Sequence, residues 1–218
     1  MKSKNKIIKI SCDGGASTGK STGAKMISKK YNLKFLSSGL LYRYASFLLM
    51  KYKPKKKINF LKKKFKRLNQ KNLNTLNLHS PEISKYSANI AKERKVRDVL
   101  KRFQINFSKK NKNCCIEGRD ISTKILPKSD VKFFFKCNLN IAAYRRYKEL
   151  KKINPKIKLK NVKKALRIRN ILDTKRKNSP LLKHRDSVSI DTGKLNKQAM
   201  LKKMSEQVER VITKKYGH

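Results

Sequence analysis

The chain has 218 residues, enough to bury one sizeable hydrophobic core, so we expect one main domain with small insertions. Its 60 Lys and Arg against 13 Asp and Glu give a formal charge of +47. The excess lysine is spread over the whole chain and Trp is absent, which favours a bias toward A/T-rich codons and no specific nucleic-acid partner. No stretch approaches the length of a membrane span, so we expect a cytoplasmic protein without a membrane partner.

The four cysteines lie on or beside apolar runs that are typical of buried strands. They are Cys12, Cys114, Cys115 and Cys137. Their spacing matches no metal-binding pattern, and adjacent residues of a strand point to opposite faces. We therefore expect buried free thiols, as is usual in a reducing cytoplasm.

A glycine-rich segment follows the apolar run over residues 7–12 and precedes a predicted helix over residues 21–31. It matches the phosphate-loop pattern G-x-x-x-x-G-K-[ST] in the strand-to-helix context that this pattern requires. Glycines let consecutive backbone N–H groups and a helix N-terminus point at one phosphate chain. Lys20 is expected to reach the β and γ phosphates of a nucleoside triphosphate, and the Ser21 hydroxyl to ligate Mg²⁺. The residues predicted to bind this nucleotide are Gly14, Gly15, Ala16, Ser17, Thr18, Gly19, Lys20, Ser21 and Thr22.

Past this loop, a short strand is expected over residues 33–36 and a helix over residues 40–52. Ligands of doubly wound sheets sit outside the carboxyl ends of the strands, and Arg43 lies near such an end, where it could bind an anion. Residues 54–79 are rich in lysine and leave two interpretations open, a mixed helical and extended insertion or a solvated linker. A helical region over residues 82–109 follows.

A third strand, over residues 113–116, ends in Glu117-Gly118-Arg119-Asp120. An acidic residue at the end of an apolar strand beside a phosphate loop is typical of a magnesium site, so Glu117 is a candidate for the water shell of the metal. The adjacent Arg119 and Asp120 could bind a phosphate and the edge of a base at once, or form an ordinary salt bridge in a turn. A fourth strand is expected over residues 131–137, whose continuous apolar run is typical of a strand covered on both faces.

The last third of the chain is predicted to form two helices, a strand and a closing helix, over residues 140–152, 159–177, 188–190 and 194–216. In the second of these helices, Arg169, Asp173 and Arg176 are spaced four and then three residues apart and share one face. Such a face is either an ion-pair ladder or a mobile lid that closes guanidinium groups over a phosphate. The alternation of strands and helices predicts an α/β fold with a parallel sheet flanked by helices.

The chain has 3 His and no Ser-His-Asp or Cys-His arrangement that would support nucleophilic catalysis. A phosphate acceptor needs no general base, because its second pKa of about 6 leaves it largely dianionic at neutral pH. The reaction then needs in-line positioning and neutralisation of charge, which Lys20, Mg²⁺ and several arginines can provide.

The motifs, in this order, resemble those of the bacterial cytidylate kinases of the nucleoside monophosphate kinase group. The likeness runs over nearly the whole chain and rests on the order and spacing of the motifs together. They are residues 13–22, Ser38-Gly39-Leu40-Leu41-Tyr42-Arg43, Val96-Arg97, Glu117-Gly118-Arg119-Asp120, Arg145-Arg146, and the run from Arg169 through Asp173 and Arg176 to Ser179-Pro180-Leu181. The resemblance implies phosphoryl transfer from ATP to CMP or dCMP with Mg²⁺.

The resemblance also implies the P-loop nucleoside monophosphate kinase fold in a single domain. The core would comprise residues 1–52, 110–150 and 186–218. A small nucleotide-binding insertion would span about 53–109, and a helical lid about 151–185. We expect the protein to be a monomer.

Carried over position by position, the resemblance assigns residues to each part of the two nucleotides. Those assigned to the phosphate of CMP are Ser38, Arg43 and Arg119. Arg97 and Asp120 are assigned to cytosine, Asp173 to ribose, and Arg169 with Arg176 to the lid and the phosphates. The residues expected to take part in catalysis are Lys20, Arg43, Arg119, Arg169 and Arg176.

Several positions depart from the family pattern. Ala16 and Ala88 stand where the family has serines that can contact the acceptor phosphate and the base, and Asn89 is a candidate substitute donor. Glu117 stands where the family has Asp. Asn170 stands where the family often has Asp. Because Ala88 removes a serine that can contact the base, a UMP or AMP kinase of the same fold is an alternative. Because the net charge is strongly positive, a P-loop ATPase that binds nucleic acid is a second alternative, although no aromatic stacking platform supports it.

Overall fold

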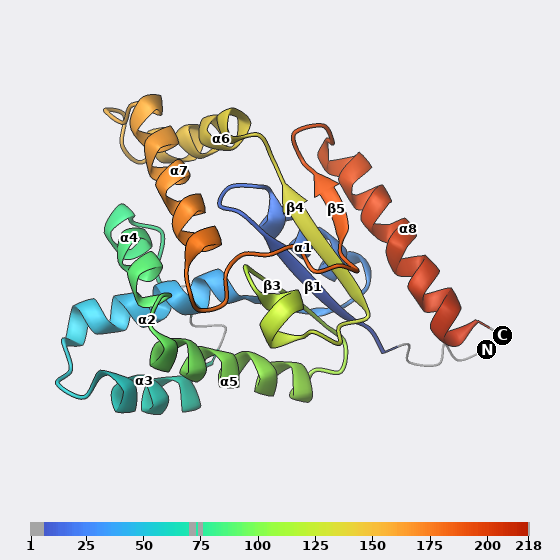
Figure 1. The fold of residues 1–218 in the computed structure, drawn as a ribbon, viewed down its shortest axis with the longest axis horizontal. Coiled ribbons are helices and arrows are strands. Elements are labelled where there is room, and N and C mark those ends of the chain that lie inside the picture. Colours follow the sequence, from blue (N-terminus) through green and yellow to red (C-terminus); the bar gives the residue numbers. More distant parts are fainter. Residues whose placement is uncertain (1–6, 70–72, 74–75, 218) are drawn as a thin grey trace.

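Five parallel strands form the centre of the computed structural model, which describes residues 7–69, 73 and 76–217 (Figure 1). In this described part of the chain the strands pair in the order β2-β3-β1-β4-β5. Their bounds are β1 Lys9–Gly14, β2 Lys34–Ser37, β3 Cys114–Gly118, β4 Val131–Lys136 and β5 Val188–Asp191. The predicted α/β fold with a parallel sheet is confirmed. Because β1 is the central strand, the loop after it lies in the middle of the carboxyl edge, where ligands of such sheets bind.

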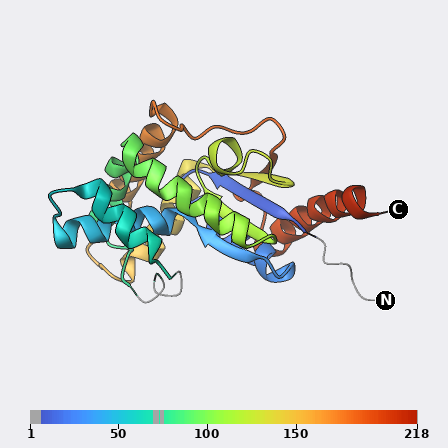
Figure 2. The ribbon, with the colours of Figure 1, turned by 90° about the horizontal axis from the view of Figure 1, so that it is seen from below.

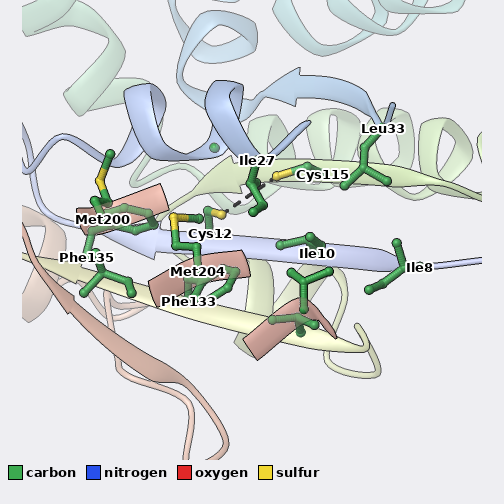
Figure 3. Packing of buried hydrophobic residues seen from close by; sticks show 14 of the residues in the cluster. Ile8, Ile10, Cys12, Ile27, Leu33, Cys115, Phe133, Phe135, Met200 and Met204 are labelled. Atoms are coloured by element: carbon green, nitrogen blue, oxygen red, sulfur yellow. Dashed lines mark hydrogen bonds between the residues drawn. The ribbon is translucent and has the colours of Figure 1, made fainter. Parts of the chain in front are cut away.

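Helices cover both faces of the sheet, which explains the continuous apolar run of β4. The covering elements are α1 Lys20–Lys30, α2 Ser38–Tyr52, α5 Arg94–Lys110, the π-helical turn η2 Ile121–Ile125, and α8 Lys197–Tyr216. On one face α1 and α8 pack on β1 and β4, and Figure 3 shows Ile27 and Met204 in one cluster with Cys12 and Phe133. On the other face α2 and α5 form a second apolar cluster with β2 and β3.

All four cysteines are free thiols. Cys12, Cys114 and Cys115 are buried as predicted, whereas Cys137 is partly exposed because it follows the last residue of β4. The sulfur atoms of Cys12 and Cys115 lie 3.8 Å apart on neighbouring strands (Figure 3). Burial, followed by the hydrogen bond with Cys115, raises the pKa of Cys12, so this thiol stays protonated at neutral pH.

The lysine-rich region 54–79 is helical in its first half. Here α3 (Lys57–Lys66) lies beside α5, and the ring of Phe65 packs edge-on against an aromatic ring of α5 with 5.7 Å between centroids. Residues 70–72 and 74–75 of this region lie outside the described residues. Figure 2 shows α3 at the end of the molecule opposite to the end of α8.

The helical region predicted over residues 82–109 consists of two helices. These are α4 (Pro81–Ile90) and α5, and the chain turns between them. The guanidinium of Arg97 in α5 donates to the carbonyl of Ala91 at the end of α4, at 3.1 Å. The segment contains neither Pro nor Gly, so no local signal marks this break.

Two further helices, α6 (Leu139–Lys151) and α7 (Leu159–Lys175), stand together beside the carboxyl edge of the sheet (Figure 1). Ala16 of the phosphate loop joins the small apolar cluster between them. Arg176 follows the last residue of α7, so it lies beyond the helix face on which it was predicted. None of the described helices is both long enough and apolar enough to cross a membrane.

Candidate active site

The phosphate loop leaves β1 at Gly14 and enters α1 through Gly19. A Cβ at Gly14 would lie 2.5 Å from the carbonyl oxygen of Phe135, so β4 approaches too closely for any larger residue. Gly19 has a φ of +73°, in the left-handed region that favours glycine. It caps α1 without a side-chain hydrogen bond, which leaves the first N–H groups of the helix for an anion.

Lys20 and Glu117 form a buried ion pair beside this loop. The hydroxyl of Ser37 donates to the other carboxylate oxygen of Glu117. Burial lowers the pKa of Lys20; burial also opposes the charge on Glu117, but the contact with Lys20 holds the pKa of this carboxyl below its usual range. Ser21 is exposed at the start of α1. Its hydroxyl and the Glu117 carboxylate are oxygen donors of the kind that Mg²⁺ prefers.

The turn after β3 is held in place by Asp13. Its carboxylate accepts hydrogen bonds from the N–H of Ile121 at 2.8 Å, and from the N–H and hydroxyl of Ser122 at 2.7 and 2.6 Å. This turn presents Asp120, which forms a buried ion pair with the guanidinium of Arg97. The two residues expected to bind the base are therefore already in contact.

Asp173 joins two arginines across the site. The Nε of Arg119 donates to one of its oxygens at 2.7 Å, and Nη1 of Arg176 lies 3.5 Å from the other. Burial opposes the charge on Asp173, but Arg119 and Arg169 hold the pKa of this carboxyl below its usual range. The ion pairs connect the end of α7 to the turn after β3, so Asp173 and Arg176 are in contact although Arg176 is outside the helix. Arg169 acts on Asp173 through its charge.

Positive charge exceeds negative charge in the arginine cluster formed by Arg43, Arg119, Arg146, Arg169 and Arg176. Burial, followed by repulsion from Arg146 and Arg119, lowers the pKa of Arg43 to about 10. Burial and repulsion from Arg119 lower the pKa of Arg169 to about 10 as well. Within the described residues, Nε of Arg169 and Nη2 of Arg176 are buried without a hydrogen-bond partner. Since buried donors are normally paired and an opposite charge favours the ionised form, the cluster fits an anionic ligand such as phosphate.

The other predicted acceptor residues lie around this cluster. Ser38 is buried, with its Cβ 3.1 Å from the position that a Cβ on Gly118 would take. Nη1 of Arg43 lies 2.6 Å from Nδ1 of His79. Asn89 is exposed on α4, and its role as a donor to the base stays a prediction.

Three residues that the sequence did not assign also lie at the site. Arg146 contributes to the repulsion within the cluster, and the adjacent pair of arginines in the sequence was the available signal. Oδ1 of Asn170 accepts a hydrogen bond from the N–H of Ala16 at 3.3 Å, and Thr192 donates to the carbonyl of Thr18 at 2.9 Å. These two contacts join residues 154 and 174 positions apart, so no local pattern could indicate them.

A sheet in this order, whose central strand leads into a phosphate loop that faces clustered arginines, belongs to a P-loop nucleoside monophosphate kinase. The comparison with protein families is more specific, because the cytidylate kinase family model matches residues 10–210. The chain belongs to the cytidylate kinase family. The resemblance found in its motifs is therefore confirmed.

Individual relatives agree with this assignment. A cytidylate kinase of Clostridium tetani is 32% identical over 222 residues, which cover 96% of this chain and 97% of that protein. A cytidylate kinase of Rickettsia canadensis is 36% identical over 188 residues, covering 86% of this chain and 85% of that protein. An uncharacterized protein from Eubacterium ventriosum has a similar fold, with a TM-score of 0.56 at 13% identity over 93% of this chain and 98% of that one.

Proposed function

We propose that this chain transfers the γ-phosphoryl group of ATP to CMP or dCMP, giving ADP and CDP or dCDP. Membership of the cytidylate kinase family supports these substrates. The structural observation that carries the proposal is the arginine cluster beside the phosphate loop, whose partly buried guanidinium groups outnumber the neighbouring carboxylates and leave two buried donors unpaired among the described residues. Two phosphate-bearing nucleotides would supply the missing charge.

The reaction needs little covalent help from the protein. An oxygen of the acceptor phosphate attacks the γ-phosphorus of ATP in line with the bond to the leaving ADP. The acceptor phosphate is largely ionised at neutral pH because its second pKa is about 6, so no general base is required. Lys20 and the arginine cluster neutralise the charge of the transferring group.

For the metal, we assign the Ser21 hydroxyl as a direct ligand and Glu117 to the surrounding water shell. Mg²⁺ at this position would neutralise oxygens of the β and γ phosphates. The exposure of Ser21 at the start of α1 and the position of Glu117 at the end of β3 support this assignment.

The acceptor site is assigned to residues of the sheet edge and of the neighbouring helices. Ser38, Arg43 and Arg119 would bind the phosphate of CMP; Arg97, Asp120 and Asn89 the base; and Asp173 the ribose. Arg169 and Arg176 would bind the transferring phosphates. We further propose residues 53–109 as the nucleotide-binding insertion and 151–185 as the lid of a cytoplasmic monomer.

The test is a coupled assay of ADP release with ATP and Mg²⁺. CMP, dCMP, UMP and AMP are compared as acceptors, with a reaction lacking acceptor and one containing DNA as controls. Preference for CMP and dCMP supports the proposal. Preference for UMP or AMP would identify that nucleotide as the acceptor instead. Turnover that depends on DNA would instead identify a nucleic-acid-stimulated ATPase.

A variant links the assay to the site. Arg43→Ala should depress turnover with CMP while calorimetry shows ATP binding nearly unchanged, because Arg43 is assigned to the acceptor. Arg102→Ala, an exposed position on α5, is the matched control and should leave both unchanged. Equal loss of ATP affinity in Arg43→Ala would contradict the assignment.

A further inference from the structure

Thr192, in the turn after β5, has all of its polar groups in hydrogen bonds. Its N–H donates to the carbonyl of Lys136 at the end of β4, at 3.0 Å. Its hydroxyl donates to the carbonyl of Thr18 in the phosphate loop, at 2.9 Å. Arg145 of α6 donates to its hydroxyl oxygen at 3.0 Å and to its carbonyl oxygen at 2.7 Å. Thr192 is only 4% exposed, so these bonds form away from bulk water.

The orientation of the Thr18 carbonyl determines the direction of the next N–H group in the loop. A peptide unit is planar, and no cis peptide bond is present in the described chain, so the carbonyl of Thr18 and the N–H of Gly19 point in opposite directions. Holding the carbonyl toward Thr192 therefore turns the N–H of Gly19 away from β5. The loop is also held from inside, since the hydroxyl of Thr18 donates to the carbonyl of Gly15 at 3.1 Å.

We propose that Thr192 is a positioning residue for ATP and acts through the peptide unit between Thr18 and Gly19. Arg145 holds the Thr192 hydroxyl so that its hydrogen is directed to the Thr18 carbonyl. The consequence is a phosphate loop that keeps its N–H groups aimed at the phosphates before nucleotide arrives, which reduces the ordering cost of binding. The inference rests on the proposed function for the identity of the nucleotide.

The experiment compares Thr192→Val with Thr192→Ser by calorimetric titration of ATP without acceptor. Valine keeps the branched shape and removes the hydroxyl, whereas serine keeps the hydroxyl. Thr192→Val should bind ATP about tenfold more weakly, which corresponds to about 1.4 kcal/mol. Thr192→Ser should stay within about twofold of the unmodified protein, and CMP affinity should change less than about twofold in both variants.

Two controls separate positioning from general stability. Ser11→Ala removes another buried hydroxyl, which contacts Ser129 at 2.8 Å away from the loop, and should lower stability without changing ATP affinity. At saturating ATP, amide hydrogen exchange at Gly19 should be faster in Thr192→Val and normal in Ser11→Ala. Arg145→Met should weaken ATP binding less in Thr192→Val than in the unmodified protein, because one of the two hydrogen bonds from Arg145 goes to the hydroxyl that valine lacks.

Four results would overturn the inference. They are unchanged ATP affinity in Thr192→Val, equal loss of ATP and CMP affinity, failure of serine to restore binding, and full additivity with Arg145→Met. A protein that binds ATP in this Thr192-dependent way but does not phosphorylate CMP would refute the proposed function alone. Normal CMP phosphorylation with ATP affinity independent of Thr192 would refute the inference alone.

Discussion

Replacing Arg169 with methionine should make the free protein more stable while removing most of its activity. The Nε of Arg169 is buried without a hydrogen-bond partner among the described residues. Burial and repulsion from Arg119 lower the pKa of Arg169 well below its usual range, to about 10. A cation with a lowered pKa destabilises the folded state at every pH below the lowered value, so the penalty is present at neutral pH. Methionine has a similar length and carries neither the charge nor the unpaired donor.

The size of the gain follows from the pKa. One pKa unit corresponds to about 1.4 kcal/mol, so the lowering sets an upper bound of roughly 3 kcal/mol. Arg169 is partly exposed, and solvent and salt screen part of this repulsion, so we expect about 1–2 kcal/mol. For a chain of this size each kcal/mol raises Tm by about 2–4 °C. Turnover should fall by about 10³ to 10⁵, the usual effect of an arginine that stabilises a transferring phosphate.

The assay is thermal and urea denaturation without nucleotide, followed by turnover with ATP and CMP. Arg167→Met provides the control, since this arginine is exposed on the same helix and its loss should change stability by less than about 0.5 kcal/mol. A less stable Arg169→Met would show that Arg169 supports the fold and would refute the argument from unbalanced charge. Normal turnover would remove Arg169 from the catalytic residues.

Three further predictions concern single residues. Ser17 has a φ of +57°, where a side chain costs about 1–2 kcal/mol. Ser17→Gly should therefore raise the free energy of unfolding by up to about 1 kcal/mol, after the entropy that glycine adds to the unfolded chain is subtracted. Ser17→Ala should give no such gain, and a less stable glycine variant would contradict backbone strain at this position. Asp173 has a lowered pKa, so its stabilisation is present above its unfolded pKa of about 3.9 and is lost as pH falls through the lower folded value. The difference in unfolding free energy between the unmodified protein and Asp173→Asn should therefore narrow below about pH 4. A difference that stays constant with pH would contradict the lowered pKa of Asp173 in the folded protein. Asp120→Ala should relax the choice among bases in the acceptor assay, and an unchanged preference would exclude Asp120 from base recognition.

The phosphate loop and the sheet could be predicted because their signals are local. The run from Gly14 to Ser21 specifies a tight anion-binding turn by residue type alone, and apolar runs of strand length between helical segments predict a parallel sheet. The break between α4 and α5 could not be predicted, because a guanidinium from Arg97 in the following helix satisfies the end of α4. This side-chain contact between residues 91 and 97 replaces the Gly or Pro that usually marks such a break.

The order of motifs nominated most arginines of the candidate site, but it did not indicate how they are paired. Arg97 with Asp120 and Arg119 with Asp173 are partners that only folding brings together. Contacts of Asn170 and Thr192 with the loop depend on where α7 and the turn after β5 come to lie. Neither residue type has a spacing rule that relates it to a phosphate loop.

The overall charge and the local charge of this protein have different origins. Within the described residues, the buried carboxylates are those of Asp13, Glu117, Asp120 and Asp173, and all four lie at the loop or its facing turn and helix. Of the 13 acidic residues in the chain, the described ones that are buried thus lie where they hold lysine and arginine side chains, or the backbone of the facing turn, in place at the candidate site. Lysine can accumulate on a solvated surface at little cost, whereas a buried guanidinium needs a defined partner. The net charge of +47 therefore says little about function, and the position of the buried carboxylates says much more.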